Sequence, residues 1–464
     1  MNIQKPIIIS AFSLATGIFI YVLALLGKKT IIISIINTIM PIVLSLICIW
    51  ASYNIIKVKR LAIYTPLPWF LLAWVLYHGF GGLAPVFLGE IVLNRYRIGN
   101  IAAEDILMVN LLNTVGLFAF CVGFYLFSHI KIFFEKITFS KFHDPWRVAL
   151  IFLILGAPIR LFLDFPRSVG LIDINLPGFI IALAGLTKLS IIPLKLASQS
   201  KHTAKIILWA VFITEIVMGL VQLAKINIVI TILILLLAEY FTRSNLKQIM
   251  VFIVGLIIVY SVFLQDFILW GRIYLQSNSA KSYDDILYII KNYNHQNYDL
   301  QKNMWWYRLC YIPEEIFVMS QYDIGDKGDS FILAKNIVLP RIIFPNKPVL
   351  TIGADFYKAI TGVEARTHTA PGIFAEAYWN GGWLLVLFTG LFVGVLFSIL
   401  GKANIHLIST GKWLYLPLIF AGIFSAMRLD DWFVSTYMQA PLNSLTLSII
   451  LNVLFSRIVF KKIK

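Results

Sequence analysis

The stretch GGWLLVLFTGLFVGVLFSIL, residues 381–400, contains no charged side chain. A helix needs about 20 apolar residues to cross the hydrocarbon core of a bilayer, so this stretch predicts a membrane span. The whole chain of 464 residues has a similar character, with 59% hydrophobic and 13% charged residues, whereas soluble domains have about 25% charged residues. The sequence therefore predicts an all-α polytopic membrane protein and excludes a large soluble core.

The length criterion predicts about 12 transmembrane helices. They are expected near residues 6–26, 31–51, 62–82, 105–128, 146–165, 176–196, 205–224, 226–241, 249–270, 381–400, 413–428 and 433–457. Glycine and proline residues interrupt the apolar pattern around 62–95 and 160–180, so the boundaries are least regular there. The first apolar stretch lacks a small-residue cleavage site and is expected to be a retained helix, not a removed signal peptide.

One long polar interval, residues 271–380, precedes the last three predicted spans. It holds 11 Lys/Arg and 11 Asp/Glu, whereas the remaining 28 Lys/Arg and 12 Asp/Glu account for the whole net charge of +16. Aromatic residues such as Trp305 and Trp306 make it unlike a disordered linker. We expect nine helices in residues 1–270, a large, partly helical loop in 271–380 and three helices in 381–464.

The distribution of the remaining cations predicts the orientation of the helices. The short segments on the side of the N-terminus hold 17 Lys/Arg, and those on the opposite side hold 7. Since Lys and Arg collect in cytoplasmic loops, both termini are predicted to be cytoplasmic and the long loop to face outward. No basic run is interleaved with aromatic residues, so a nucleic-acid partner is not expected. The sequence contains neither a nucleotide-binding P-loop nor metal-ligand spacing, and no cofactor or metal is predicted.

The segment LPRIIFPNKP, residues 339–348, contains three prolines that prevent a continuous helix. They place Arg341 and Lys347 on a stiff turn near the bilayer, where both cations are available to a phosphate group. Two partners fit this pattern, the diphosphate of a substrate and the anionic headgroups of the membrane.

Residues 365–382, ARTHTAPGIFAEAYWNGG, contain the second candidate segment. Thr369 and Pro371 predict the start of a helix, whose N-terminal amides would form an anion site with Arg366 and His368. Glu376 is expected about two turns inside that helix, where a carboxylate beside His368 offers a general base. The alternatives are that Glu376 neutralises a neighbouring Arg and that His368 is an exposed loop residue.

Three further cations are candidate substrate contacts: Arg272, Arg308 and Arg160. Arg160 lies in an apolar segment, where an unpaired charge is costly, and Asp164 one turn later is its expected partner. Glu314 and Glu315 follow Pro313 and are interpreted as charges that stabilise the first turn of a helix.

The chain resembles the bacterial O-antigen-type (Wzy-like) oligosaccharide-repeat-unit polymerases. The residues that resemble the family are Pro340-Arg341, Phe344-Pro345, Lys347-Pro348, Glu376-Ala-Tyr378 and Asn380-Gly381. The resemblance implies a glycosyltransferase of surface polysaccharide biosynthesis (O-antigen, capsule or exopolysaccharide). Such an enzyme joins undecaprenyl-diphosphate-linked oligosaccharides at the outer face of the bacterial inner membrane. A chain-length-regulating membrane protein is a further expected partner.

Three other functions remain open. A structural or scaffold membrane protein would not need Arg366, His368 and Glu376 grouped beside a helix start. An O-antigen-type ligase has a loop of this kind and transfers the finished glycan to an acceptor lipid or protein. A transporter or flippase of lipid-linked sugars would place its charged residues within the spans. The sequence instead concentrates its balanced charges in the loop, which favours the polymerase.

Overall fold

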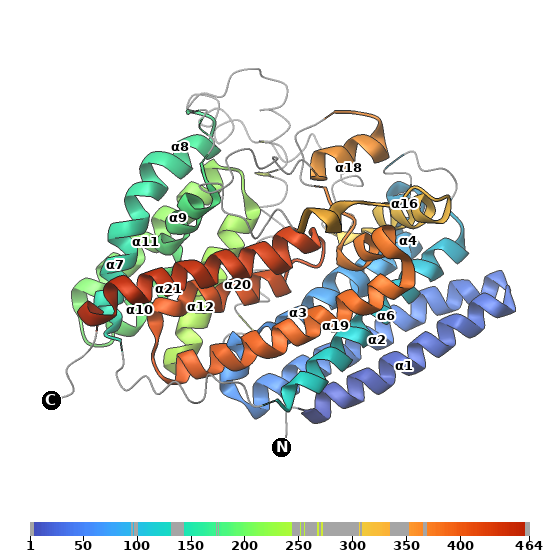
Figure 1. The fold of residues 1–464 in the computed structure, drawn as a ribbon, viewed down its shortest axis with the longest axis horizontal. Helices are drawn as coiled ribbons and strands as arrows, with labels where there is room; N and C mark the ends of the chain where they lie inside the picture. The colour runs from blue at the N-terminus through green and yellow to red at the C-terminus, as the bar shows by residue number, and fades with distance from the viewer. Residues whose placement is uncertain are drawn as a thin grey trace. The chain divides into compact units, whose positions relative to one another are not determined.

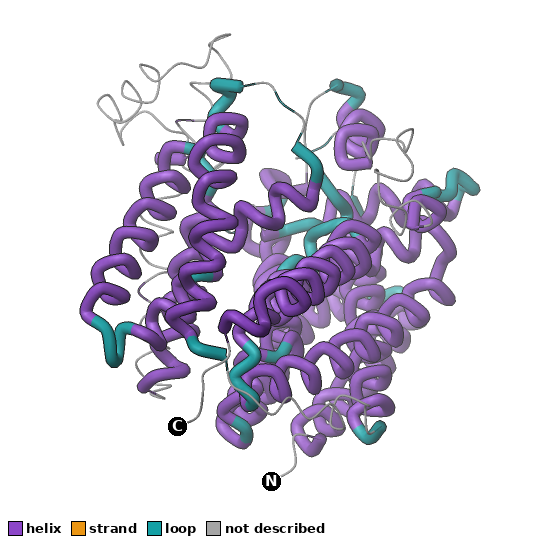
Figure 2. The backbone as a smooth tube through the Cα atoms, turned by 60° about the vertical axis from the view of Figure 1, so that its left-hand side comes forward, coloured by secondary structure: helices purple, strands orange, loops and turns teal. Residues whose placement is uncertain are grey.

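The structure is a computed structural model. It describes residues 4–93, 96, 101–130, 143–172, 174, 176–243, 251, 255, 267–268, 271, 306, 309–334, 352–364 and 369–459. Every regular element in this part of the chain is a helix (Figure 2). Ten helical segments of the described residues are long and apolar enough to cross a membrane. The chain is therefore an all-α multi-pass membrane protein, and the predicted fold class is confirmed.

The long helical segments overlap ten of the predicted spans. They are α1 (Gln4–Gly27), α2 (Thr30–Val58), α3 to α4 (Pro66–Leu88), α6 (Ala103–Ser128), α7 to α8 (Pro145–Ser168), α9 and α10 (Gly178–Ala197), α11 (His202–Val221), α12 (Lys225–Arg243), α19 (Ile373–Ser409) and η11 with α21 (Val434–Val459). The predicted span 413–428 corresponds to a shorter apolar helix, Trp413–Ala426, which contains α20 (Leu416–Ala426). The predicted span 249–270 lies almost entirely outside the described residues.

The chain divides into two compact units, each built from separate segments. Unit 1 contains Met1–Thr138, Gln301–His406 and Ile419–Leu442, and unit 2 contains Phe139–Leu300, Leu407–Leu418 and Asn443–Lys464. Both units therefore combine residues from before and after the polar interval.

In unit 1, α1, α2 and α6 pack against one another, and glycines bring α19 against α6 (Figure 1). A Cβ added to Gly394 would lie 2.2 Å from the backbone oxygen of Phe120, and one added to Gly390 would lie 2.5 Å from that of Gly116. The spacing GxxxG is typical of close helix contacts in membranes, where small residues allow backbones to approach.

In unit 2, α7 (Pro145–Ile159) packs against α9 (Gly178–Leu189) and α10 (Ile191–Ala197), and α10 contacts α11 and α12 (Figure 1). The chain leaves α7 through η4, a π-helical segment at Arg160–Asp164. A π-helical turn contains an extra residue and is frequent at functional sites.

The start of α19 differs from the prediction. The helix begins at Ile373, not at Thr369 or Pro371, because Gly372 has a φ of +87° and the backbone N–H of Ile373 donates to the oxygen of Leu429. Glu376 consequently lies in the first turn and not two turns inside the helix. Gly381 and Gly382 have non-helical backbone angles that separate residues 373–380 from the apolar span. That break coincides with the predicted start of the span.

Candidate functional site

In unit 1, the described residues 309–334 and 352–364 form a folded structure that we call the cap. It contains the helices α16 (Ile312–Asp323), η9 (Ser330–Leu333) and α18 (Ile352–Thr361). Phe356 of α18 is buried and its ring contacts those of Phe317, Trp379 and Trp432. The prediction of a partly helical segment is confirmed for this part of the interval.

Three consecutive polar side chains of α19 bind the cap. Tyr378 Oη donates to Asp323 Oδ1 at 2.9 Å, and Trp379 Nε1 donates to the backbone oxygen of Asp326 at 3.0 Å. Asn380 Nδ2 donates to Ser330 Oγ at 2.9 Å. Tyr378 and Asn380, which are among the residues that resemble the polymerase family, thus help to attach the cap to the first part of α19.

Glu376 lies at the centre of this attachment and is 0% exposed. Ser330 Oγ donates to its Oε1 at 2.6 Å, and the backbone N–H of Phe433 donates to its Oε2 at 2.6 Å. Glu376 therefore connects η9, α19 and the segment that precedes η11 (Val434–Gln439). Because both oxygens accept hydrogen bonds from protein groups, its role as a general base stays a prediction.

Two acidic residues follow α20 beside this attachment. Thr436 Oγ1 donates to Asp431 Oδ2 at 2.6 Å, and the exposed Arg428 lies 2.9 Å from the same oxygen. Tyr311 Oη donates to Asp430 Oδ2 at 3.0 Å, and burial raises the pKa of Asp430 above its usual value. Asp430 is therefore held by a neutral donor, whereas Asp431 has a cationic partner.

Glu314 and Glu315 lie in the first turn of α16 as predicted, but each is only 1% exposed. Asn113 Nδ2 of α6 lies 3.0 and 3.2 Å from the two oxygens of Glu315, and Tyr96 Oη donates to Glu314 at 2.9 Å. Burial raises the pKa of Glu315 to about 8. The interpretation as charges that cap a helix is therefore incomplete, because both carboxyl groups bind side chains outside α16.

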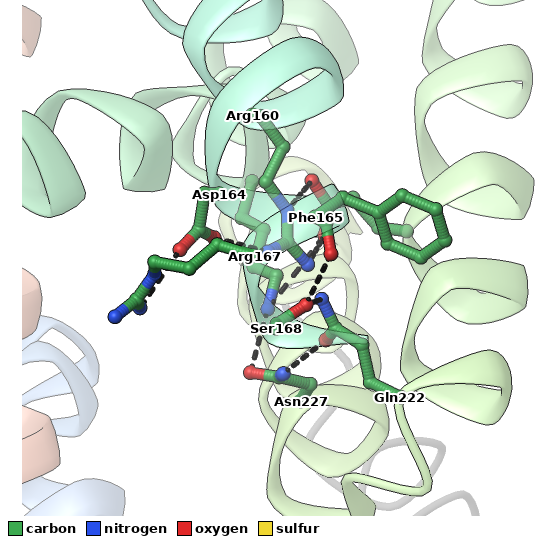
Figure 3. Close-up of polar contacts among 9 residues, drawn as sticks. Arg160, Asp164, Phe165, Arg167, Ser168, Gln222 and Asn227 are labelled. Atoms are coloured by element: carbon green, nitrogen blue, oxygen red, sulfur yellow. Dashed lines mark hydrogen bonds and ion pairs between the residues drawn. The ribbon is translucent and has the colours of Figure 1, made fainter. Parts of the chain in front are cut away.

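Unit 2 contains the other described site residue, Arg160 (Figure 3). Its Nη1 lies 2.5 Å from Asp164 Oδ2, so the predicted pair is confirmed. The same guanidinium binds both oxygens of Glu215, with Nε at 3.2 Å and Nη2 at 3.1 Å. This bidentate arrangement fixes the orientation of the planar guanidinium group.

The network extends from Arg160 across unit 2. Lys188 Nζ lies 3.6 Å from Glu215 Oε2 and donates to Asn227 Oδ1 at 2.9 Å. Gln222 accepts from Asn227 at 2.8 Å and donates to Ser168 Oγ at 2.6 Å (Figure 3). Three side chains of this network (Arg160, Lys188 and Glu215) thus lie within predicted membrane spans and satisfy one another.

Six predicted site residues lie outside the described residues: Arg272, Arg308, Arg341, Lys347, Arg366 and His368. Their convergence on one site stays a prediction. Glu376 belongs to unit 1 and Arg160 to unit 2.

Four partners of charged groups were not predicted from the sequence: Ser330, Asn113, Lys188 and Glu215. Glu215 and Lys188 had a detectable signal, since single charges in apolar runs are costly unless they are paired. No sequence signal marked Ser330, because its partner Glu376 is 46 residues away in sequence. Among the described residues, no group of three or more His, Cys, Asp or Glu is arranged to hold a metal ion.

Comparisons with known proteins do not assign the chain to a family. No family model matches it. Neither a curated protein nor a solved structure matches it either. The resemblance to the Wzy-like polymerases depends on the quoted residues alone.

Proposed function

We propose that the chain is a membrane glycosyltransferase that polymerises oligosaccharide repeat units linked to undecaprenyl diphosphate. The proposal includes a location in the bacterial inner membrane, cytoplasmic termini and a cap that faces outward. One observation carries it: polar side chains of residues 376–380 attach a folded cap to the part of α19 that precedes its apolar span. Such a polar structure beside an apolar span suits an enzyme whose substrate combines a polar sugar diphosphate with a membrane lipid.

The reaction needs no energy source besides its donor. A sugar hydroxyl of one lipid-linked unit attacks the anomeric carbon of the growing chain, and the bond from that carbon to the lipid diphosphate breaks. The hydroxyl proton passes to a base, and the diphosphate leaves with the bonding electron pair. In the proposal Glu376 is the base and His368 orients the acceptor or contacts phosphate. The diphosphate is proposed to be stabilised by cations of the unit that contains Glu376, namely Arg341, Lys347, Arg366 and Arg308. Arg272 and Arg160 belong to unit 2, where Arg160 is held by Glu215 and Asp164, and they are not assigned to this step.

The test uses the purified full-length protein in liposomes with lipid-diphosphate-linked repeat units as the sole substrate. Chain growth without a second acceptor is the expected result. Transfer that occurs only after a separate acceptor lipid or protein is added would identify a ligase. The absence of any glycosyl transfer with several repeat-unit structures would reject the enzymatic proposal.

A transporter of lipid-linked sugars is the second candidate, because one observation favours it. Arg160, Lys188 and Glu215 form a buried charged network within membrane spans of unit 2. Ionisable groups at such depth are typical of transport pathways. In the same liposomes, movement of a labelled lipid-linked unit between leaflets without chain growth would support transport over polymerisation.

A further inference from the structure

A second buried polar group in unit 1 is independent of the proposed transfer chemistry. Its members come from three elements: Glu315 of α16, Asn113 of α6, and His78 of η2 (Val75–Phe80). His78 Nδ1 lies 3.7 Å from Glu315 Oε1, a distance too long for a hydrogen bond. Exposed fractions of 1%, 2% and 7% for Glu315, Asn113 and His78 show that water does not solvate the group.

Contacts with neighbouring helices hold His78, Asn113 and Glu315 in place. His78 lies in a π-helical turn, and its ring is 6.0 Å from that of Trp74. Trp74, the last residue of α3 (Pro66–Trp74), donates through Nε1 to the backbone oxygen of Asn113 at 3.2 Å, which connects α3 to α6 just before η2 begins. Glu315 Oε1 would lie 3.9 Å from a Cβ added to Gly372, the residue before α19. The carboxyl group therefore lies beside the start of the helix that bears Glu376.

The surroundings of Glu315 provide little compensation for a negative charge. Within the described part of the chain, no Lys or Arg lies at ion-pair distance from it, and Asn113 is its hydrogen-bond donor. The neighbouring titratable groups are Glu314, the preceding residue, and His78. Tyr96 binds Glu314, and Tyr311, whose ring contacts that of Tyr77, binds Asp430. The acids of α6, Glu104 and Asp105, lie in its first turn, about two turns or more from Asn113.

Asn113 provides a separate indication of a ligand. Its Oδ1 is buried without a hydrogen-bond partner, and an unpaired buried acceptor costs about 1–3 kcal/mol. A protonated carboxyl group gains an O–H donor that a carboxylate lacks. Rotation of the amide would then allow Oδ1 to accept from Glu315, so that a single proton satisfies both groups.

We propose that Glu315, together with Asn113 and His78, forms a proton-binding site within unit 1. The ligand is a proton taken from water, and the described residues provide no three-ligand set for a metal ion in its place. The bound proton neutralises the Glu315 carboxylate next to Gly372 and thereby stabilises the contact between α16 and the start of α19. The site functions whether or not the chain transfers sugars.

The direction of the pH effect follows from the raised pKa of Glu315. Burial moves this pKa from 4.5 to about 8, so the folded protein keeps the proton over a range in which the unfolded chain has lost it. The stabilising contribution is complete below pH 4.5, decreases as the pH rises, and is lost above about pH 8.

Difference infrared spectroscopy of the purified full-length protein tests the proposal, because a carboxylic acid and a carboxylate absorb at different frequencies. A titration from about pH 6 to about pH 10 is expected to remove a carboxylic acid band with a midpoint near pH 8. Glu376 is a second buried carboxyl group that can contribute to this band, so both substitutions are made in the Glu376→Gln protein. There, Glu315→Gln should lower the amplitude of the band, whereas Glu364→Gln, which changes a carboxylate that is 80% exposed, should leave it unchanged. An unchanged amplitude in the protein with Glu315→Gln would overturn the assignment.

A second variant decides the question if Glu315→Gln fails to fold. Asn113→Leu removes the amide whose nitrogen donates to the carboxylate and whose oxygen accepts from the protonated acid, so the midpoint should move by about one pH unit. An unchanged midpoint in a folded Asn113→Leu protein would overturn the proposal. Since neither readout requires sugar transfer, failure here is distinguishable from failure of the proposed enzymatic activity.

Discussion

The two units stabilise buried carboxylates in opposite ways. Glu215 in unit 2 lies between two cations, Arg160 at 3.1 Å and Lys188 at 3.6 Å. Glu376 in unit 1 accepts instead from a hydroxyl and a backbone N–H. A network of paired charges depends on each of its members, because removal of one leaves another buried and unpaired. A carboxyl group with neutral donors can gain or lose a proton without leaving a buried partner charge uncompensated.

The largest effect is therefore expected in unit 2. Glu215→Leu leaves Lys188 without its ion-pair partner and Arg160 with Asp164 alone, and it should destabilise the folded protein by about 3–5 kcal/mol. Unfolding by heat or denaturant in detergent, compared with the unchanged protein, measures this loss.

Two controls separate lost charge pairing from lost packing. Combining Glu215→Leu with Lys188→Met removes the cation that has lost its ion pair, while Arg160 keeps its pair with Asp164, and it should recover most of the stability. Glu364→Gln breaks a pair with Lys358 whose side chains are 80% and 58% exposed, and it should cost only about 0–1 kcal/mol. If Glu215→Leu costs no more than Glu364→Gln, the contrast between the units is wrong.

A smaller effect is expected at the attachment of the cap. Ser330→Ala removes one hydrogen bond to Glu376 and should destabilise unit 1 by about 1–3 kcal/mol. Glu376→Gln should cost less, since its amide can accept from Phe433 and donate to Ser330 Oγ.

Chain growth by the same two variants distinguishes two roles of Glu376. As a base, Glu376 contributes about 100- to 10,000-fold, so Glu376→Gln should lose activity by that factor while Ser330→Ala keeps most of it. Equal losses in both variants would show that Glu376 only positions the cap.

The sequence predicted the helices better than their connections. Uninterrupted apolar runs such as residues 381–400 were sufficient to locate spans, because the bilayer requires both length and hydropathy. The start of α19 was misplaced by the Thr369 and Pro371 pattern, since the hydrogen bond from Ile373 to Leu429 joins residues 56 positions apart. Short-range capping signals do not reveal such tertiary contacts.

The candidate site shows the same limit. Arg160 and Asp164 were paired correctly because i and i+4 residues share one helix face. Glu215 completes that pair from 55 residues away, and Asn113 reaches Glu315 across 202 residues. Polar residues in apolar runs mark positions that need a partner, but only the packing of the helices determines which partner they find.

The central claim is that the cap faces the compartment that contains the lipid-linked units. Single cysteines that replace Lys327 of the cap and Lys201 of unit 2 test it, since both lysines are exposed and the native cysteines Cys48, Cys121 and Cys310 are buried. In intact cells, a thiol reagent that cannot cross the inner membrane reaches only its outer face. This reagent should label Lys327→Cys. It should label Lys201→Cys only after the membrane is opened. Labelling of Lys201→Cys from outside together with protection of Lys327→Cys would invert the topology and contradict the proposed function.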